Sequence, residues 1–299
     1  MAQQLNLPDG RNLDYLVSGA KDGFPLVWIH GTPGAYMPPP SLVTACEKKG
    51  IMVISFSRAG YGGSTRKQGR QIVDYVADTQ ALIDHLGVER CLVGGWSGGG
   101  MFPCPHALVS AARLRGCVAA LCVAGVALYD AEGLDFLAGQ GEDNIVEFNA
   151  ALRGIDELQK FCAISRTEML KGDVAGMVEA MSSLLPDVDK DALMNGNGMG
   201  EYLHGTINEG LKISANGWVD DTMSSLKPWG FELSEIKVPV IVYQGSEDKM
   251  VPYAHGEWLV NHLPQEKLSK HLMQGQGHVS IFIGQEDTML DELLDVAKL

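Results

Sequence analysis

The stretch Cys91–Gly99, CLVGGWSGG, joins a short apolar run to a group of glycines that contains one serine. Gly95, Ser97 and Gly99 match the pattern G-x-S-x-G, in which a sharp strand-to-helix turn exposes a serine hydroxyl above a sheet. Small residues beside such a serine let neighbouring chain pass closely. The apolar run before Ser97 and the helix-like residues after it favour a nucleophile over an ordinary glycine-rich loop.

Short apolar runs with the character of buried strands recur along the chain. Runs that are apolar throughout, rather than alternating, indicate burial on both faces, as in a parallel sheet covered by helices. In Val73–Leu86, apolar residues recur three or four positions apart and Gly87 follows as a stop signal, which predicts a helix. This alternation predicts a doubly wound, mostly parallel α/β fold. The expected strands are Leu13–Val17, Pro25–His30, Ile51–Phe56, Cys91–Gly94, Cys117–Val126, Val238–Tyr243 and Leu268–Met273.

The strand pattern is interrupted between about Tyr129 and Glu235. This segment of roughly 100 residues, the size of a small domain, contains acidic helix-like pieces and many methionines. Because the strand pattern resumes at Val238, we expect a helical cap inserted into one sheet. The predicted division is a first core part at 1–128, the cap at 129–235 and a second core part at 236–299.

Composition and charge limit the partners and the compartment. The chain has 299 residues, 45% of them hydrophobic, and a formal net charge of -14. An acidic surface repels phosphate backbones and gains nothing from anionic lipid, so we expect no nucleic acid partner. The first residues do not resemble a secretory signal, and the longest apolar run, Cys117–Leu128, is too short to span a membrane. The six cysteines include no C-x-x-C pair, so we expect a reduced, cytoplasmic protein without disulfides or membrane insertion.

A second loop of interest is His30–Gly34, HGTPG, which follows the apolar run PLVWI. Ligands of open α/β sheets bind at the carboxyl ends of strands, so this loop and the one at Ser97 are expected at the same edge. A tight turn here would aim the backbone N–H of Thr32 at the point that the N–H of Gly98 also faces, which would form an oxyanion hole. The alternative is an ordinary Gly/Pro turn.

Asp248 and His278 both follow late strand-like runs. The order Ser…Asp…His along the chain is that of one known arrangement of a catalytic triad. In this arrangement His278 takes the proton of Ser97, while Asp248 fixes the histidine tautomer and stabilises the imidazolium. Asp130, after the run Cys117–Leu128, is the alternative acid, or else caps the first helix of the insertion. The G-x-x-D context of Asp248 fits the role of the acid better.

Together these residues resemble the α/β-hydrolase superfamily, and the resemblance covers essentially the whole chain. It is carried by HGTPG (30–34), SRAGYGGST (57–65), GGWSGGG (94–100), GSEDKMVP (245–252) and GQGH (275–278). The interruption at 129–235 lies where that superfamily carries its helical cap. By resemblance, Ser97, Asp248 and His278 form the triad, and Thr32 with Gly98 shapes the oxyanion hole, next to Gly31 and Trp96.

Two departures from the superfamily pattern bear on the reaction. Related dehalogenases and epoxide hydrolases have Asp as the nucleophile, so Ser97 argues against both reactions and favours acyl transfer to water. In the loop after the run Ile51–Phe56, Ser57-Arg58 stands where an Asp is common among relatives. We expect this change to affect how that loop is anchored rather than the chemistry.

The segment Met101–Pro105 is unusual because two prolines stand where the helix after the nucleophile begins. Proline is tolerated in a first helical turn but breaks a helix interior. We therefore expect either a helix that starts late, near Pro105, or an extended turn, and each would affect the placement of Gly98 and Ser97.

The sequence predicts a serine hydrolase that cleaves a small, fairly apolar ester, lactone or amide through an acyl-enzyme. We expect a small-molecule substrate and no cofactor, and the histidines lack the spacing of metal ligands. The same triad also suits a carbon–carbon bond hydrolase, a perhydrolase or a lyase. A receptor with slow turnover and a moving cap is a further alternative. An aminopeptidase would need a cap carboxylate facing inward, for which Asp143, Glu147 and Glu201 are candidates.

Overall fold

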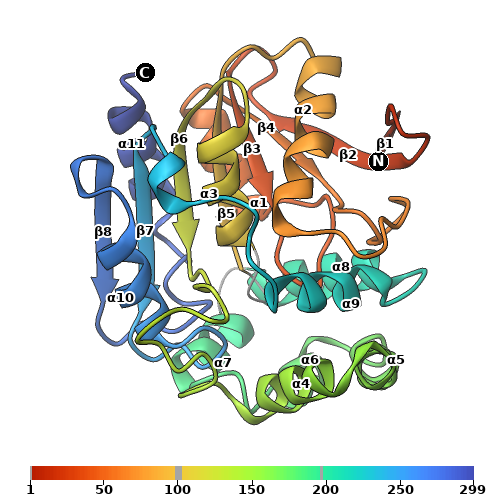
Figure 1. Cartoon of the computed structure of the whole chain (residues 1–299). Helices are drawn as coiled ribbons and strands as arrows, with labels where there is room; N and C mark the ends of the chain where they lie inside the picture. Colours follow the sequence, from red (N-terminus) through yellow and green to blue (C-terminus); the bar gives the residue numbers. More distant parts are fainter. Residues whose placement is uncertain (1, 98–102, 196–197) are drawn as a thin grey trace.

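The computed structural model describes residues 2–97, 103–195 and 198–299 (Figure 1). In this part of the chain eight strands form a single sheet in the order β1-β2-β4-β3-β5-β6-β7-β8. The pairs β1–β2 and β2–β4 are antiparallel, and the other pairs are parallel. The mostly parallel α/β fold predicted from the sequence is therefore confirmed.

Each predicted strand is present, with bounds that differ by a few residues at most. The strands are β1 (Gln3–Asn6), β2 (Asn12–Gly19), β3 (Phe24–Ile29), β4 (Ile51–Phe56), β5 (Cys91–Trp96), β6 (Cys117–Val123), β7 (Val240–Gly245) and β8 (Leu268–Met273). The sequence reasoning missed β1, because this short edge strand is polar and largely exposed and shows no apolar run.

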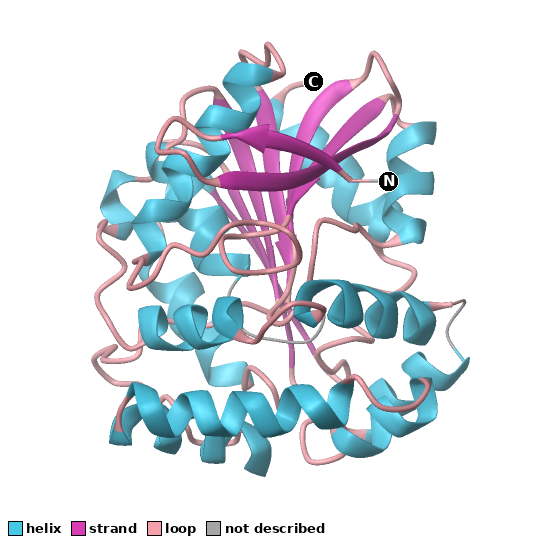
Figure 2. Ribbon diagram, turned by 90° about the vertical axis from the view of Figure 1, so that its right-hand side faces the viewer, coloured by secondary structure: helices cyan, strands magenta, loops and turns pink. Residues whose placement is uncertain are grey.

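Helices cover both faces of the sheet (Figure 2). On one face, α1 (Pro40–Lys48) and α11 (Glu286–Ala297) pack with Leu26 and Trp28 of β3. On the other, α2 (Tyr75–His85), α3 (Pro103–Arg113) and α10 (Tyr253–His262) pack with Val27 and Ile29 of the same strand. Successive side chains of β3 thus point into two separate cores, which is why its sequence is apolar throughout. The short 3₁₀ helices are η1 (Ile72–Asp74), η2 (Leu233–Glu235) and η3 (Gln265–Lys267).

Between β6 and β7 the chain forms a series of helices, here called the cap. They are α4 (Glu142–Arg153), α5 (Ile155–Met169), α6 (Val174–Ala180), α7 (Asp187–Asn195), α8 (Met199–Leu211) and α9 (Asn216–Ser225). Figure 1 shows the cap beyond the arrowheads of the parallel strands, with α8 and α9 on the side nearer the sheet. The predicted helical insertion is present, while its division at 128 and 235 stays a prediction.

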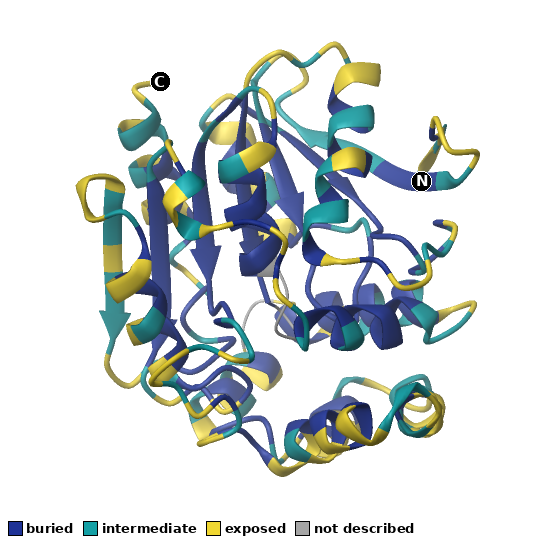
Figure 3. Ribbon diagram, in the orientation of Figure 1, coloured by how far each residue is buried: buried dark blue, intermediate teal, exposed yellow. Residues whose placement is uncertain are grey.

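The register of the sheet brings several strand ends together beneath the cap. Trp96 of β5 lies opposite Val123 of β6, which in turn lies opposite Tyr243 of β7. On the other side of β5, Gly95 pairs with Ile29 of β3. The loops after these strands therefore leave the sheet at one edge. This edge is mostly buried, because the cap covers it (Figure 3).

The helix after Ser97 begins earlier than the sequence suggested. Residues 98–102, which include Gly98 and the first two residues of the segment Met101–Pro105, lie outside the described residues. Helix α3 starts at Pro103 rather than near Pro105, so both prolines fall in its first turn. There a missing N–H costs little, because the first N–H groups of a helix have no partner inside it.

All six cysteines are buried and unpaired. Among the helices of the described residues, none has both the length and the apolar composition needed to cross a membrane.

Candidate active site

The structure brings Ser97, Asp248 and His278 together at the carboxyl edge of the sheet. Ser97 directly follows β5, Asp248 lies in the loop after β7, and His278 lies in the loop after β8. All three residues are buried. The Nδ1 of His278 is 2.8 Å from Oδ2 of Asp248, and its Nε2 is 3.1 Å from the carbonyl oxygen of Ser97. The imidazole thus lies between the carboxylate and the residue predicted to be the nucleophile.

The hydroxyl of Ser97 is buried and has no hydrogen-bond partner among the described residues. The Nε2 of His278 faces the main chain of Ser97 rather than its Oγ. Catalytic hydrogen bonds of unliganded enzymes are often loose and become short only in the complex with substrate. The arrangement therefore shows a histidine next to the serine, with the serine hydroxyl still available.

Asp248 is held in a fixed orientation by its own loop. Its Oδ1 accepts the backbone N–H groups of Met250 and Val251, each at 2.8 Å. Its Oδ2 accepts from Nε2 of Gln244 at 3.1 Å, in addition to the contact with His278. Asp130, the alternative acid, is exposed in the turn after β6. The geometry therefore favours Asp248 as the partner of His278.

The surroundings of His278 set both its tautomer and its basicity. Because Asp248 accepts at Nδ1, that nitrogen carries a proton. The carbonyl of Ser97 can only accept, so Nε2 makes its contact with that oxygen as a donor in the protonated ring, and loss of this proton leaves Nε2 able to accept from a hydroxyl. Burial by itself would lower the pKa of His278, but the charge of Asp248 and its hydrogen bond outweigh burial and raise the pKa above the ordinary value of 6.5. A histidine of this kind is a stronger base toward a neighbouring hydroxyl.

Trp96 supports the loop after β8 that contains His278, here called the histidine loop. Its indole Nε1 donates to the carbonyl oxygen of His278 at 2.9 Å, and its ring stacks on Phe282 with 4.5 Å between the ring centres. We expected Trp96 to lie next to the oxyanion hole, and the backbone of Trp96 does precede Ser97. The indole, however, is buried against the histidine loop and is absent from the described lining of the cavity.

The HGTPG loop follows β3, which pairs with β5, the strand that directly precedes Ser97. The ring of His30 ties this loop together, since Nδ1 donates to the carbonyl of Gly31 at 2.6 Å and Nε2 accepts the backbone N–H of Arg58 at 3.0 Å. Burial, together with the charge of Arg58, lowers the pKa of His30 well below its usual value, so the ring is neutral. The backbone N–H of Thr32 makes no hydrogen bond to the described residues, which leaves it available to an oxyanion.

Arg58, which lies in the loop after β4, anchors the HGTPG loop. Its guanidinium donates to the carbonyls of His30 and Gly31 and, at 2.6 Å, to Oγ1 of Thr32. Asp221 of α9 accepts from Arg58 at 2.7 Å and from the Thr32 hydroxyl at 2.7 Å. Burial alone would raise the pKa of Asp221, but Arg58 and Arg70 lower it far below the ordinary range, so this carboxylate is charged.

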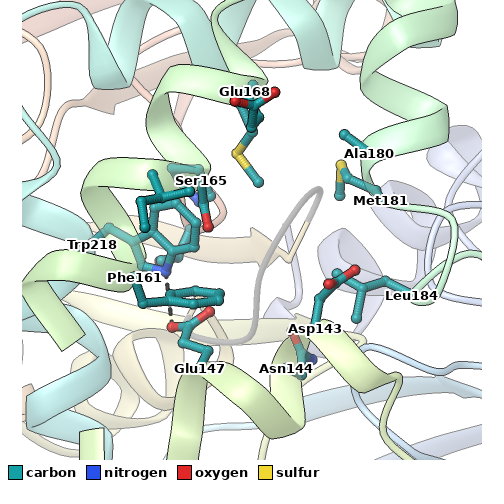
Figure 4. A pocket seen from close by; sticks show the side chains of 14 residues that line it. Asp143, Asn144, Glu147, Phe161, Ser165, Glu168, Ala180, Met181, Leu184 and Trp218 are labelled. Carbon is teal, nitrogen blue, oxygen red and sulfur yellow. Dashed lines mark hydrogen bonds between the residues drawn. The ribbon is translucent and has the colours of Figure 1, made fainter. Parts of the chain in front are cut away.

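A cavity of about 330 Å³ lies between the HGTPG loop and the cap (Figure 4). Its described lining is Thr32, Pro33, Asp143, Asn144, Glu147, Phe161, Ile164, Ser165, Glu168, Met169, Ala180, Met181, Leu184 and Trp218. Three of these side chains are carboxylic acids and none is basic, while aromatic and aliphatic groups form most of the remainder. Within the described residues, no group of three or more His, Cys, Asp or Glu side chains could hold a metal ion.

Glu147 is the buried acid of the cavity wall. Its Oε1 accepts from Nε1 of Trp218 at 2.9 Å and from Oγ1 of Thr222 at 2.6 Å. Figure 4 shows the contact with Trp218 beside the ring of Phe161. Burial raises the pKa of Glu147 from 4.5 to about 7, against the opposing effect of these two hydrogen bonds.

Comparison with known families decides the classification. The model of the family described as having the alpha/beta hydrolase fold matches residues 25–285. The chain belongs to the α/β-hydrolase family. It is therefore an enzyme of this family. The mostly parallel sheet of the described residues, with Ser97, Asp248 and His278 in loops at its carboxyl edge, agrees with that membership.

Individual relatives of this hydrolase are distant. A non-heme chloroperoxidase of Streptomyces lividans is 26% identical over 250 residues, which cover 82% of each chain. The structure of a thermophilic esterase of Thermogutta terrifontis aligns with a TM-score of 0.67 and 17% identity over 100% of both chains. That of an enol-lactonase of Burkholderia xenovorans aligns with a TM-score of 0.65 and 15% identity over 99% of this chain and 100% of the other. At such identities the structural matches show the fold alone.

Sequence reasoning missed two cap residues that contact the catalytic loops, Asp189 and Asp221. Both are fully buried aspartates on helices, which is uncommon for a charged residue and marks a specific partner. No motif identifies them, because their partners are backbone N–H groups and arginines from distant parts of the chain. Glu147 was one of three acids named as candidates to face inward. It lines the cavity, as does Asp143, while Glu201 is exposed.

Proposed function

We propose that this hydrolase cleaves a small, fairly apolar ester, lactone or amide through an acyl-enzyme formed on Ser97. The observation that carries the proposal is the contact of His278 with Asp248 at 2.8 Å, with the other ring nitrogen directed at Ser97. A buried imidazole that is oriented by a carboxylate and lies beside a serine is the arrangement required of a general base.

The proposed reaction proceeds in two halves. Nε2 of His278 takes the proton of the Ser97 hydroxyl as Oγ attacks the substrate carbonyl, and His278 then returns the proton to the leaving group. The backbone N–H of Thr32 binds the oxyanion of the tetrahedral intermediate, and Gly98, which lies outside the described residues, is the predicted second donor. Water activated by His278 then releases the acid and restores Ser97.

The cavity shares Thr32 with the proposed oxyanion hole, while Ser97, Asp248 and His278 are not among its described lining residues. If the substrate occupies this cavity, its lining supports a choice of substrate class. A space of about 330 Å³ suits a small acyl or alcohol portion, and rings such as Phe161 and Trp218 favour apolar groups. The acids Asp143, Glu147 and Glu168, with no basic residue in the described lining, disfavour a substrate that carries its own carboxylate. The esterase and enol-lactonase named among the structural neighbours act within the same range of chemistry.

Steady-state kinetics on p-nitrophenyl esters of increasing chain length, simple lactones and aminoacyl amides test the proposal. We expect short neutral esters or lactones to be turned over, and Ser97→Ala and His278→Ala to lose activity by several orders of magnitude. Turnover that persists in folded Ser97→Ala would contradict the mechanism. A matched pair of esters with and without a distal carboxylate tests the substrate class, since we expect the neutral ester to be preferred.

A second candidate, perhydrolysis, is favoured by the similarity to a protein named as a non-heme chloroperoxidase. If hydrogen peroxide replaces water in the second half-reaction, the acyl group leaves Ser97 as a peracid, and a peracid oxidises halide in solution. Bromide oxidation measured with acetate and peroxide detects this route. We expect it to require Ser97 as well, so halide oxidation that survives Ser97→Ala would exclude the acyl-enzyme route to it.

A further inference from the structure

A carboxylate of the cap holds the loop that bears His278. Asp189, the third residue of α7, is completely buried. Its Oδ2 accepts the backbone N–H of His278 at 2.7 Å, and its Oδ1 accepts those of Val279 at 3.1 Å and Ser280 at 2.9 Å. Three successive N–H groups thus converge on one side chain, an arrangement that creates a concave site for an anion. Here a residue from another part of the chain occupies that site.

The residue before the histidine is fitted to this contact. A Cβ atom on Gly277 would lie 2.4 Å from both carboxylate oxygens of Asp189, far inside the van der Waals limit. Glycine at this position therefore allows α7 to approach the main chain of the histidine loop. The N–H of Gly277 donates to Oγ of Ser280 at 2.8 Å, which closes the turn around the contact.

The hydrogen bond from the backbone N–H of His278 to Asp189 links His278 to the cap, whereas its other contacts described here are with the core. On the core side, Trp96 donates to the carbonyl of His278, and Asp248 accepts from Nδ1 of the ring. Asp189, on α7 of the cap, accepts the backbone N–H of His278. The backbone of His278 is thus fixed at its N–H by the cap and at its carbonyl by the core.

We propose that Asp189 is a positioning residue for His278, so that full catalytic rate requires α7 of the cap to be docked on the histidine loop. This inference rests on the proposed role of His278 as the general base. Asp189 makes its hydrogen bonds to the main chain of the histidine loop, and its charge also contributes to the raised pKa of His278, but it does not touch the substrate. Its expected effect is therefore on the rate of the chemical step and not on the affinity for substrate.

The physical reason lies in what the loop would lose. Without the carboxylate, buried N–H groups lack an acceptor, and the loop must move to find water or another partner. Asparagine keeps the size of Asp189 but offers one oxygen and an NH₂ group, which repels an N–H donor. A displacement of the imidazole by about 1 Å is enough to cost roughly 100-fold in rate.

The test compares Asp189→Asn with Asp187→Asn, which removes the same charge from an exposed position on the same helix. We expect kcat on the best ester to fall roughly 10- to 100-fold in Asp189→Asn while KM stays within about twofold. The rate at which a fluorophosphonate labels Ser97 should fall in parallel. Asp187→Asn should match the wild type in both measurements, and circular dichroism with thermal melts verifies that the variants are folded.

Gly277→Ala disturbs the same contact by adding a methyl group on the histidine loop, and it keeps the carboxylate of Asp189. It therefore serves as the test if Asp189→Asn does not fold. It should show the same loss of kcat, and the double variant should lose less than the product of the two single losses, because both break one contact. An unchanged kcat in either folded variant, or an increase confined to KM, overturns the inference. His278→Ala distinguishes the proposed function from the positioning role of Asp189. If His278→Ala stays active, the proposed function is wrong. If His278→Ala is inactive while Asp189→Asn has normal activity, only the positioning role is wrong.

Discussion

Arg58 of the core and Asp221 of the cap form an ion pair, with 2.7 Å between Nη2 and Oδ2 and with side chains that are only 2% and 0% exposed. Arg70 pairs with the other oxygen of the same carboxylate. Thr32 donates its hydroxyl to Asp221 as well, so the HGTPG loop is joined to α9 through one charged group. Breaking a buried pair by removing one partner leaves an uncompensated charge in a medium that solvates it poorly.

Asp221→Asn should therefore lower the free energy of unfolding by roughly 3–5 kcal/mol, because Arg58 and Arg70 lose their common counter-charge. Urea denaturation followed by circular dichroism measures the change. Glu157→Gln is the control, since it breaks the exposed pair of Glu157 with Lys160 and should leave the urea midpoint where it was. Equal midpoints for Asp221→Asn and the wild type would show that the buried pair does not stabilise the docked cap.

The pH dependence of activity should report the pairing of His278 with Asp248. The base must be neutral to accept a proton, and its pKa is raised above 6.5, so kcat/KM should decline as pH falls through an apparent pKa higher than 6.5. A profile of kcat/KM between pH 5 and 9 on a neutral ester, whose own charge does not change, measures this limb. An acid limb well below 6.5 would contradict the assignment of His278 as a carboxylate-paired base.

Asp248→Asn removes the charge that raises the pKa of His278, while an amide still fills the site. We expect kcat to fall by about 10⁴-fold, the size of effect seen when a triad histidine is held in the wrong tautomer. The remaining activity should show its acid limb at lower pH than in the wild type. Asp130→Asn serves as the control and should leave rate and profile unchanged, and a loss confined to this control would transfer the role of acid to Asp130.

Glu147 should make stability depend on pH in the direction opposite to that of a salt-bridged carboxylate. Its pKa rises from 4.5 to about 7 on folding, so the folded state binds more protons than the unfolded chain between these values. Stability should therefore decrease as pH rises from about 4.5 to 7, with a contribution of about 3 kcal/mol from this one group. Glu147→Gln should remove that contribution, and urea titrations at several pH values compare the slopes. Parallel slopes in the two proteins would show that Glu147 is ionised in the folded state.

The sequence contained enough to predict the sheet and the residues gathered at its edge. Ser97, Asp248 and His278 each follow an apolar run, and parallel strands place the residues that follow them at the same edge of the sheet. The edge strand β1 escaped because its residues Gln3–Asn6 bury too little apolar surface to leave a pattern. The start of α3 at Pro103 follows from a local rule, the tolerance of proline in a first turn, and it differs from both expectations, a start near Pro105 or an extended turn.

The contacts between cap and core could not be predicted. Asp189 is 89 residues from His278 in the chain, and Asp221 is 163 residues from Arg58. On a helix, an aspartate that faces solvent and one that faces a distant backbone look the same in sequence. Only the packing of the cap on the strand ends decides which carboxylates are buried, and that packing depends on the whole chain.

The central claim is that Ser97 forms the covalent intermediate with the help of His278. The most direct measurement is fluorophosphonate labelling followed by digestion and tandem mass spectrometry to locate the adduct. We predict a single adduct on the peptide that contains Ser97, no adduct in folded Ser97→Ala, and greatly slowed labelling in His278→Ala. An adduct at another residue, or unchanged labelling of Ser97→Ala, would contradict the account.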